Sequence, residues 1–164
     1  MRLFKSVILL SLITSLASCS KSDFSVTAPK GWVVVDTVSE AFGRFVKMHP
    51  SVISTVPVFV ENISISIVKF PSVDLYIGSS LSDIKKSAEF FQEKGKGDID
   101  INKYQARWVQ YTIRTKGSDI TAEQKIYFIK EYGNIYQIVC TSEAMQMKKF
   151  QVQVNEILES FKIL

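Results

Sequence analysis

Three successive runs of alternating residues in the second half of the chain restrict the fold more than any other feature. The runs are residues 103–115, 120–132 and 134–141, and the turns between them are residues 116–119 and 133–134. Long alternating runs joined by short turns are typical of neighbouring antiparallel strands. We therefore expect a strand meander at the centre of the structure, and a short lead-in strand before it at residues 98–102.

The first half of the chain carries further strand signals. Residues 62–70 have the clearest period of two in the sequence, and the apolar face consists of Ile63, Ile65 and Ile67. A period of two is the pattern of a strand with one buried face. Residues 32–38 and 42–48 are apolar runs that we expect to form an antiparallel hairpin. Residues 24–28 alternate as an edge strand, and the Pro29-Lys30-Gly31 turn ends that strand.

Two segments have helical periodicity. Ser80-Leu81-Ser82-Asp83 is a capping-box pattern, which predicts a helix that begins there and ends at Gly95. Its apolar stripe consists of Leu81, Ile84, Ala88 and Phe91. A terminal helix is expected over residues 142–162, with an apolar stripe of Phe150, Val154, Ile157, Leu158 and Phe161. The order of strands, helix, meander and helix predicts an α+β fold whose sheet is covered by the two helices.

The N-terminus has the layout of a secretory signal, with a basic start at residues 1–5 and an apolar run at residues 6–16. The run is about half the roughly 20 residues that a transmembrane helix needs. It ends in Leu16-Ala17-Ser18-Cys19, the order of small residues and cysteine that bacterial lipoprotein signal peptidase requires. The pattern predicts cleavage between Ser18 and Cys19 and acylation of the Cys19 thiol. The alternatives are a plain secretory signal cut near Ala17 and a short buried helix.

Acylation at Cys19 determines where the rest of the chain resides. Residues 1–18 would be removed, residues 19–23 would be a lipidated tether, and residues 24–164 a single globular domain. Each acyl CH₂ contributes about 0.8 kcal/mol of membrane affinity, so two or three palmitate-like chains hold a protein stably. We expect an extracytoplasmic protein of the cell envelope. Ser20 after the cysteine favours the outer membrane if the organism has one.

The charge balance excludes one class of partner. Without residues 1–18, 146 residues remain, with 18 Lys and Arg against 16 Asp and Glu, a formal charge of +2. The densest basic cluster, Lys85, Lys86, Lys94 and Lys96, is interspersed with acidic residues, as on a solvated surface. We expect no nucleic-acid partner, because nucleic-acid binding requires a concentrated basic patch.

The chain lacks the usual residue sets for catalysis. If Cys19 is acylated, Cys140 has no disulfide partner, and its apolar surroundings indicate a buried packing residue. The chain has one histidine, His49, so a Cys140/His49 pair is what a small envelope hydrolase would have to use. One histidine and one free cysteine do not make a zinc site, and no Gly-rich phosphate loop is present. We therefore predict no cofactor and no metal.

The meander is rich in aromatic residues, and some of these are candidates for binding. Alternation places Trp108 and Gln110 on one face of the sheet and Tyr111 on the other. An uncovered part of the sheet that displays these residues would be a mixed aromatic and polar binding surface. A third function, carriage of a small apolar ligand between sheet and helices, remains an alternative.

Several of these features together resemble the PsbP-like superfamily, which includes bacterial lipoproteins similar to DcrB. They are the opening Phe24-Ser25-Val26-Thr27-Ala28-Pro29-Lys30-Gly31-Trp32, the helix after the Ile-rich strand, Ala106-Arg107-Trp108, the Tyr-rich meander and the closing Glu159-Ser160-Phe161. The resemblance implies an α/β/α sandwich around a mainly antiparallel sheet. It also implies an accessory or binding role, as in photosystem support, small-GTPase binding or phage adsorption, and no catalytic residue set. We therefore predict a lipid-anchored, non-catalytic envelope protein that binds another envelope protein or polymer.

Overall fold

The computed structural model of the protein describes residues 23–39, 43–51 and 59–164. In chain order its elements are β1 (Phe24–Ser25), β2 (Trp32–Ser39), β3 (Gly43–Pro50), β4 (Asn62–Lys69), α1 (Val73–Ser87), β5 (Ala88–Ile101), β6 (Tyr104–Thr115), β7 (Ala122–Glu131), β8 (Asn134–Glu143), α2 (Met147–Ser160) and β9 (Lys162–Ile163). The predicted signal segment, the cleavage site at Ser18 and Cys19, and most of the tether lie outside the described residues.

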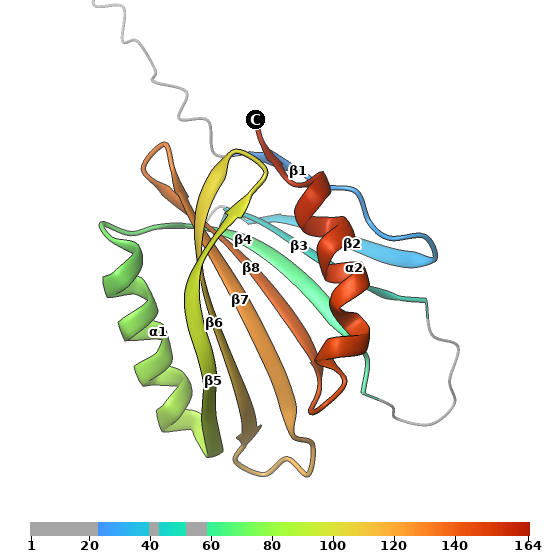
Figure 1. The fold of residues 1–164 in the computed structure, drawn as a ribbon, viewed down its shortest axis with the longest axis vertical. Coiled ribbons are helices and arrows are strands. Elements are labelled where there is room, and N and C mark those ends of the chain that lie inside the picture. Colours follow the sequence, from blue (N-terminus) through green and yellow to red (C-terminus); the bar gives the residue numbers. More distant parts are fainter. Residues whose placement is uncertain (1–22, 40–42, 52–58) are drawn as a thin grey trace, which may run out of the picture.

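Seven strands form one antiparallel sheet in the order β2-β3-β4-β8-β7-β6-β5 (Figure 1). The predicted hairpin is β2 and β3, and the predicted meander is β6, β7 and β8. Both predictions are confirmed. The terminal strands β1 and β9 form a separate two-stranded pair, in which Phe24 lies opposite Ile163. This pairing brings the start of the described chain to its C-terminal end.

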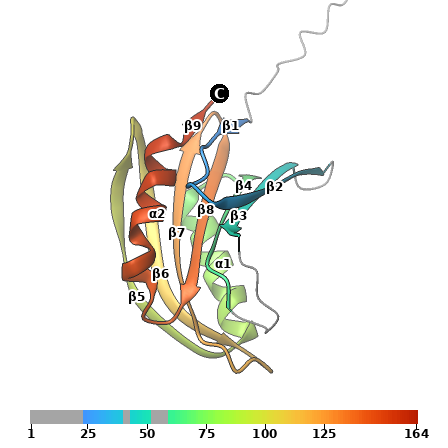
Figure 2. The same cartoon turned by 90° about the vertical axis from the view of Figure 1, so that its right-hand side faces the viewer.

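The two helices lie on opposite faces of the sheet (Figure 2). The core between the sheet and α2 includes Val46, Met48, Ile63, Ile65, Tyr127, Tyr136, Ile138, Phe150, Ile157 and Phe161. The core on the α1 side contains Val109, Tyr111, Ile113, Ile126, Phe128 and Ile135, against which Tyr76, Leu81 and Ile84 pack. Successive residues of β6 and β7 thus alternate between the two cores. The arrangement is the α/β/α sandwich that the resemblance to the PsbP-like superfamily implies.

The position of α1 differs from the sequence prediction. The helix covers Val73–Ser87 instead of beginning at Ser80, and Ser72 is its N-cap. The predicted second half of the helix is strand β5, in which Phe91 pairs with Ile113 of β6. Phe91, the last residue of the predicted apolar stripe, nevertheless packs against the core on the α1 side, from strand β5. Aromatic residues favour strands, and a long ladder with β6 outweighs the helical spacing of a few apolar residues.

The terminal helix is shorter than predicted and covers Met147–Ser160. Ser142 and Glu143 instead continue β8, where they pair with β7. Met145, which falls within the predicted helix, is instead exposed and has a φ of 70° in the turn before α2. No helix within the described residues combines the length and the apolar character that a membrane span requires.

Candidate functional site

The Cys140/His49 pair is not assembled. Cys140 is fully buried, and its backbone lies opposite Ile63, which in turn lies opposite Met48 of β3. His49 is the residue after Met48, so its side chain projects to the other face of the sheet. Burial raises the pKa of the Cys140 thiol, which disfavours the thiolate that a nucleophile needs. Cys140 is therefore a packing residue, as its surroundings in the sequence indicate.

A metal site would require a cluster of ligand side chains, and a carrier of a small ligand would require space between the sheet and a helix. In the part of the chain that the structure describes, no group of three or more His, Cys, Asp and Glu side chains could hold a metal ion. The layer between the sheet and α2 is filled by fully buried side chains such as Tyr127, Tyr136 and Ile138. A groove of about 560 Å³ lies outside this layer, and its lining includes charged Asp98, Asp100, Arg107 and Lys130.

The structure does not bring together the three residues predicted as a binding surface. Tyr111 is 1% exposed, lies in the core on the α1 side and packs on Phe91 with ring centroids 5.1 Å apart. Trp108 and Gln110 lie on the opposite face, towards α2. Both are only half-buried, and Gln110 donates a hydrogen bond to Glu123 across 2.5 Å. Tyr111 is thus not part of a surface, whereas a binding role for Trp108 and Gln110 stays a prediction.

Trp108 lies over the neighbouring strand β5, at two glycines. A Cβ atom at Gly95 or Gly97 would come within 3.2 or 3.1 Å of the indole, so glycine allows the ring to lie flat on this strand. The Lys125 ammonium group lies 4.7 Å from the centre of the indole ring, and burial lowers the pKa of Lys125. These contacts tie Trp108 into the domain. They leave it less suited to a partner than its residue type indicates.

A more exposed apolar surface lies on the β2–β3 hairpin, where the sequence analysis predicted no site. Pairing in register places Val33 opposite His49, Val35 opposite Lys47 and Thr37 opposite Phe45, all on the face that points away from α2. We call the surface made of Val33, Val35, Thr37, Phe45, Lys47 and His49 the hairpin face. The exposed fractions of Val33, Val35 and Phe45 are 41%, 44% and 39%.

The sequence contains a signal for this surface. Val33-Val34-Val35 is an apolar run without alternation, so β2 is apolar on both of its faces. Such a run is typical of a strand buried on both sides, yet these valines remain exposed. Only the sheet order reveals the difference, because β2 lies at the edge of the sheet. Large apolar side chains grouped at an exposed edge are typical of interaction sites.

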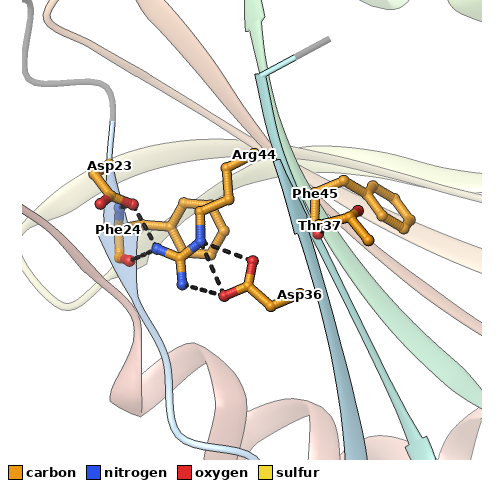
Figure 3. Close-up of polar contacts among 6 residues, drawn as sticks. All are labelled: Asp23, Phe24, Asp36, Thr37, Arg44 and Phe45. Atoms are coloured by element: carbon orange, nitrogen blue, oxygen red, sulfur yellow. Dashed lines mark hydrogen bonds and ion pairs between the residues drawn. The ribbon is translucent and has the colours of Figure 1, made fainter. Parts of the chain in front are cut away.

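Arg44 of β3 connects the hairpin to the beginning of the described chain (Figure 3). Its guanidinium group donates hydrogen bonds to both carboxylate oxygens of Asp36, at 3.0 and 2.7 Å, and it also contacts the Asp23 carboxylate. It donates a further bond of 2.8 Å to the Phe24 carbonyl oxygen and lies 4.8 Å from the centre of the Phe24 ring. Arg44 therefore holds Asp23 and Phe24 against β2 and β3. We call these four residues the Arg44 node.

The geometry of the node explains two pKa shifts. The hydrogen bonds from Arg44 lower the pKa of Asp36, and those to Asp36 and Asp23 raise the pKa of Arg44. The side chain of Asp36 is 41% exposed, so solvent weakens the interaction. The node is nevertheless bidentate and includes a backbone contact, a geometry that gives more stability than an isolated surface ion pair.

Replacing Asp36 by asparagine is expected to lower the free energy of unfolding at neutral pH by up to about 1 kcal/mol. Because the pKa of Asp36 is lower in the folded state, this contribution is present above the ordinary aspartate pKa of about 3.9 and is lost as pH falls through the folded pKa. The difference between wild type and D36N in urea unfolding should therefore shrink below about pH 4. Asp83→Asn is the control, because Asp83 and Lys86 form an exposed pair. A pH-independent D36N effect would contradict the prediction.

Comparison with solved structures identifies the fold. PsbP from the cyanobacterium Synechocystis is 12% identical with a TM-score of 0.57, and the match covers 93% of this chain and 99% of that one. LpqN of Mycobacterium tuberculosis, described as involved in cell envelope biogenesis, is 14% identical with a TM-score of 0.60, over 85% and 82% of the two chains. The Ran-binding protein Mog1p of Saccharomyces cerevisiae is 9% identical with a TM-score of 0.57, over 85% and 89%.

Sequence comparison finds no such relative: no family model matches the chain, and no curated protein matches it. At 9–14% identity, likeness to solved structures is evidence about the fold and not about activity. The matches to these neighbours nevertheless cover 85–93% of this chain. The chain therefore has the PsbP-like fold, as the resemblance in its sequence implies.

Proposed function

We propose that this protein is a lipid-anchored, non-catalytic module of the cell envelope that acts by binding another envelope protein or polymer. In this proposal residues 1–18 are removed, Cys19 carries the acyl chains, and the domain faces the extracytoplasmic side. Ser20 favours the outer membrane in an organism that has one. The fold neighbours support such a role, since LpqN is described as acting in envelope biogenesis and Mog1p as a Ran-binding protein.

The observation that carries the proposal is the hairpin face, with the Arg44 node on the opposite face of the same two strands. Val35 and Phe45 are apolar and exposed, and Lys47 adds one positive charge between them. Neither of the two cores includes these side chains, so they retain free apolar area for a partner. Asp23, four residues after Cys19, is held at the same hairpin by Arg44. Because Arg44 holds Asp23 on the opposite face of these two strands, a partner on the hairpin face would bind the same hairpin that holds the start of the described chain.

The test is a matched pair of variants in a pull-down. Phe45 and Phe90 are exposed to 39% and 42% and lie on strands β3 and β5, near opposite edges of the sheet. Full-length tagged protein carrying Phe45→Ser or Phe90→Ser is purified from detergent-solubilised envelopes. We expect a stoichiometric partner with wild type and F90S and about tenfold less with F45S, as for an aromatic residue inside an interface. Repeated recovery of wild type alone, or equal loss with both variants, would contradict a partner site on the hairpin face.

A further inference from the structure

Strand β2 is an edge strand with no strand beside it among residues 23–39, 43–51 and 59–164. All eight of its residues pair with β3, and it stands last in the sheet order. In antiparallel strands the backbone N–H and C=O groups of every second residue point outward. The outer side of β2 therefore presents a row of backbone donors and acceptors that can pair with another strand.

The two edges of the sheet differ in how they prevent such pairing. Strand β5, at the far edge, contains six charged residues and two shifts of register. Charges and bulges are the usual means by which proteins block an edge. Strand β2 contains one charged residue, Asp36, and neither lysine nor proline. The contrast within one sheet indicates that the β2 edge is kept available for pairing.

We propose that β2 pairs antiparallel with β2 of a second copy of the chain, so that two seven-stranded sheets become continuous. Two copies that pair side by side in this way are related by a two-fold axis normal to the sheet. Such an axis leaves each side chain on its own face, and opposite residues of antiparallel strands share a face. A residue of one copy can therefore lie opposite only a residue whose number differs from its own by an even number. The residue at the centre of the pairing then lies opposite its own counterpart in the second copy, and the two-fold axis passes between the two.

Three residues near the middle of β2 can lie on the axis, and Val35 fits best. An axis through Asp36 places two carboxylates directly opposite each other, which destabilises a sheet. An axis through Val34 brings residues 30 and 31 into the ladder, where the φ of 81° at Gly31 ends the strand. An axis through Val35 pairs residues 32–38 throughout. It places Val33 opposite Thr37 of the second copy and Asp36 opposite an uncharged valine.

The Arg44 node is compatible with this arrangement on a membrane. Arg44 holds Asp23 on the face of the hairpin that carries Asp36 and points towards α2 (Figure 3). Because the axis is normal to the sheet, both copies keep Asp23 on the same side of the joined sheet. Asp36 is next to Val35, so the two nodes lie close to the axis. Two tethers on one side can reach one membrane, a point that rests on the proposed lipid anchor, and confinement there raises the effective concentration of the two copies.

Cysteine cross-linking tests both the pairing and its register in the full-length protein in its own membranes. Val35→Cys places two thiols opposite each other, with Cα atoms about 4.5–5.5 Å apart, inside the range for a disulfide. Val33→Cys is the matched control, because it lies on the same face and is exposed to 41%, against 44% for Val35. Its two copies would lie about 13 Å apart, too far for a bridge. Cys140 is buried and does not compete.

Mild oxidation is expected to give a disulfide-linked dimer with V35C and monomer with V33C on a non-reducing gel. The double variant Val33→Cys, Thr37→Cys is expected to dimerise as well, since each residue lies opposite the other. Monomer from both V35C and the double variant, or equal dimer from V33C and V35C, would overturn the proposal. Membrane retention of V35C is scored in parallel. Retained but uncross-linked protein overturns the pairing alone, whereas cross-linked protein in the soluble fraction overturns the anchor alone.

Discussion

Replacing Phe161 by alanine is expected to lower the free energy of unfolding by about 3–5 kcal/mol, the range for a buried Phe→Ala change. Phe161 is fully buried immediately after α2. Its ring contacts Phe24, Tyr104 and Tyr136, with centroids 5.7, 6.4 and 6.1 Å apart. Its backbone carbonyl accepts a hydrogen bond from the Asn102 side chain across 2.8 Å. The truncation therefore removes contacts with β1, β6 and β8 together.

The measurement is urea unfolding of F161A and of Phe90→Ala, followed by far-UV circular dichroism. Phe90 is 42% exposed on β5, so the same chemical change there should cost about 1 kcal/mol or less. Loss of Phe161 is also expected to loosen β1, because Phe24 packs on it, and to speed amide exchange at residues 24 and 25. Equal destabilisation by the two substitutions would contradict the role of Phe161 in joining β1 and the C-terminal segment to the core.

Replacing Cys19 by serine is expected to remove the protein from the membrane fraction and to abolish incorporation of labelled palmitate. A hydroxyl at this position does not take the diacylglyceryl group, and without about 0.8 kcal/mol per acyl CH₂ no comparable attachment remains. The fold should be unchanged, because Cys19 precedes the described residues that build the two cores.

Cys140→Ala is the control for Cys19→Ser. It removes the other cysteine of the chain from a buried position, so it should keep full membrane retention and palmitate labelling. Cell fractionation and metabolic labelling of both variants separate the two thiols. A Cys19→Ser protein that stays on the membrane, with no diffusible form, would show that the acylation site is wrongly assigned.

The period of two in the sequence was sufficient to predict the strands that have one buried face. Ile63 and Ile65 alternate with serines in the sequence and are fully buried in β4, as predicted. The opposite faces of Val109 and Trp108 follow from the same rule, because successive side chains of a strand point to opposite sides. The short turns between the alternating runs were sufficient to predict the order of the strands in the meander.

Local patterns failed where tertiary pairing competes with them. Residues 80–95 have helical spacing, yet the chain changes from helix to strand at Ala88, where the ladder with β6 begins. The candidate binding surface of Trp108, Gln110 and Tyr111 stays a prediction, but its three side chains do not share one face. Aromatic content pointed to the meander, but Tyr111 is buried against Phe91 of β5, and the indole of Trp108 lies against Gly95 and Gly97.

By itself, the sequence determined the α+β class, the antiparallel meander and the buried role of Cys140. These depend on periodicity, turn residues and polarity, which act between residues close in the chain. Only the tertiary structure decided which strand lies at the edge and which aromatic residues a helix covers. It also decided that Arg44 joins Asp23 to Asp36. Such contacts depend on the order of strands in the sheet, a property of residues far apart in the chain, and for that reason the exposed hairpin face and the β2 edge emerge only from the folded arrangement.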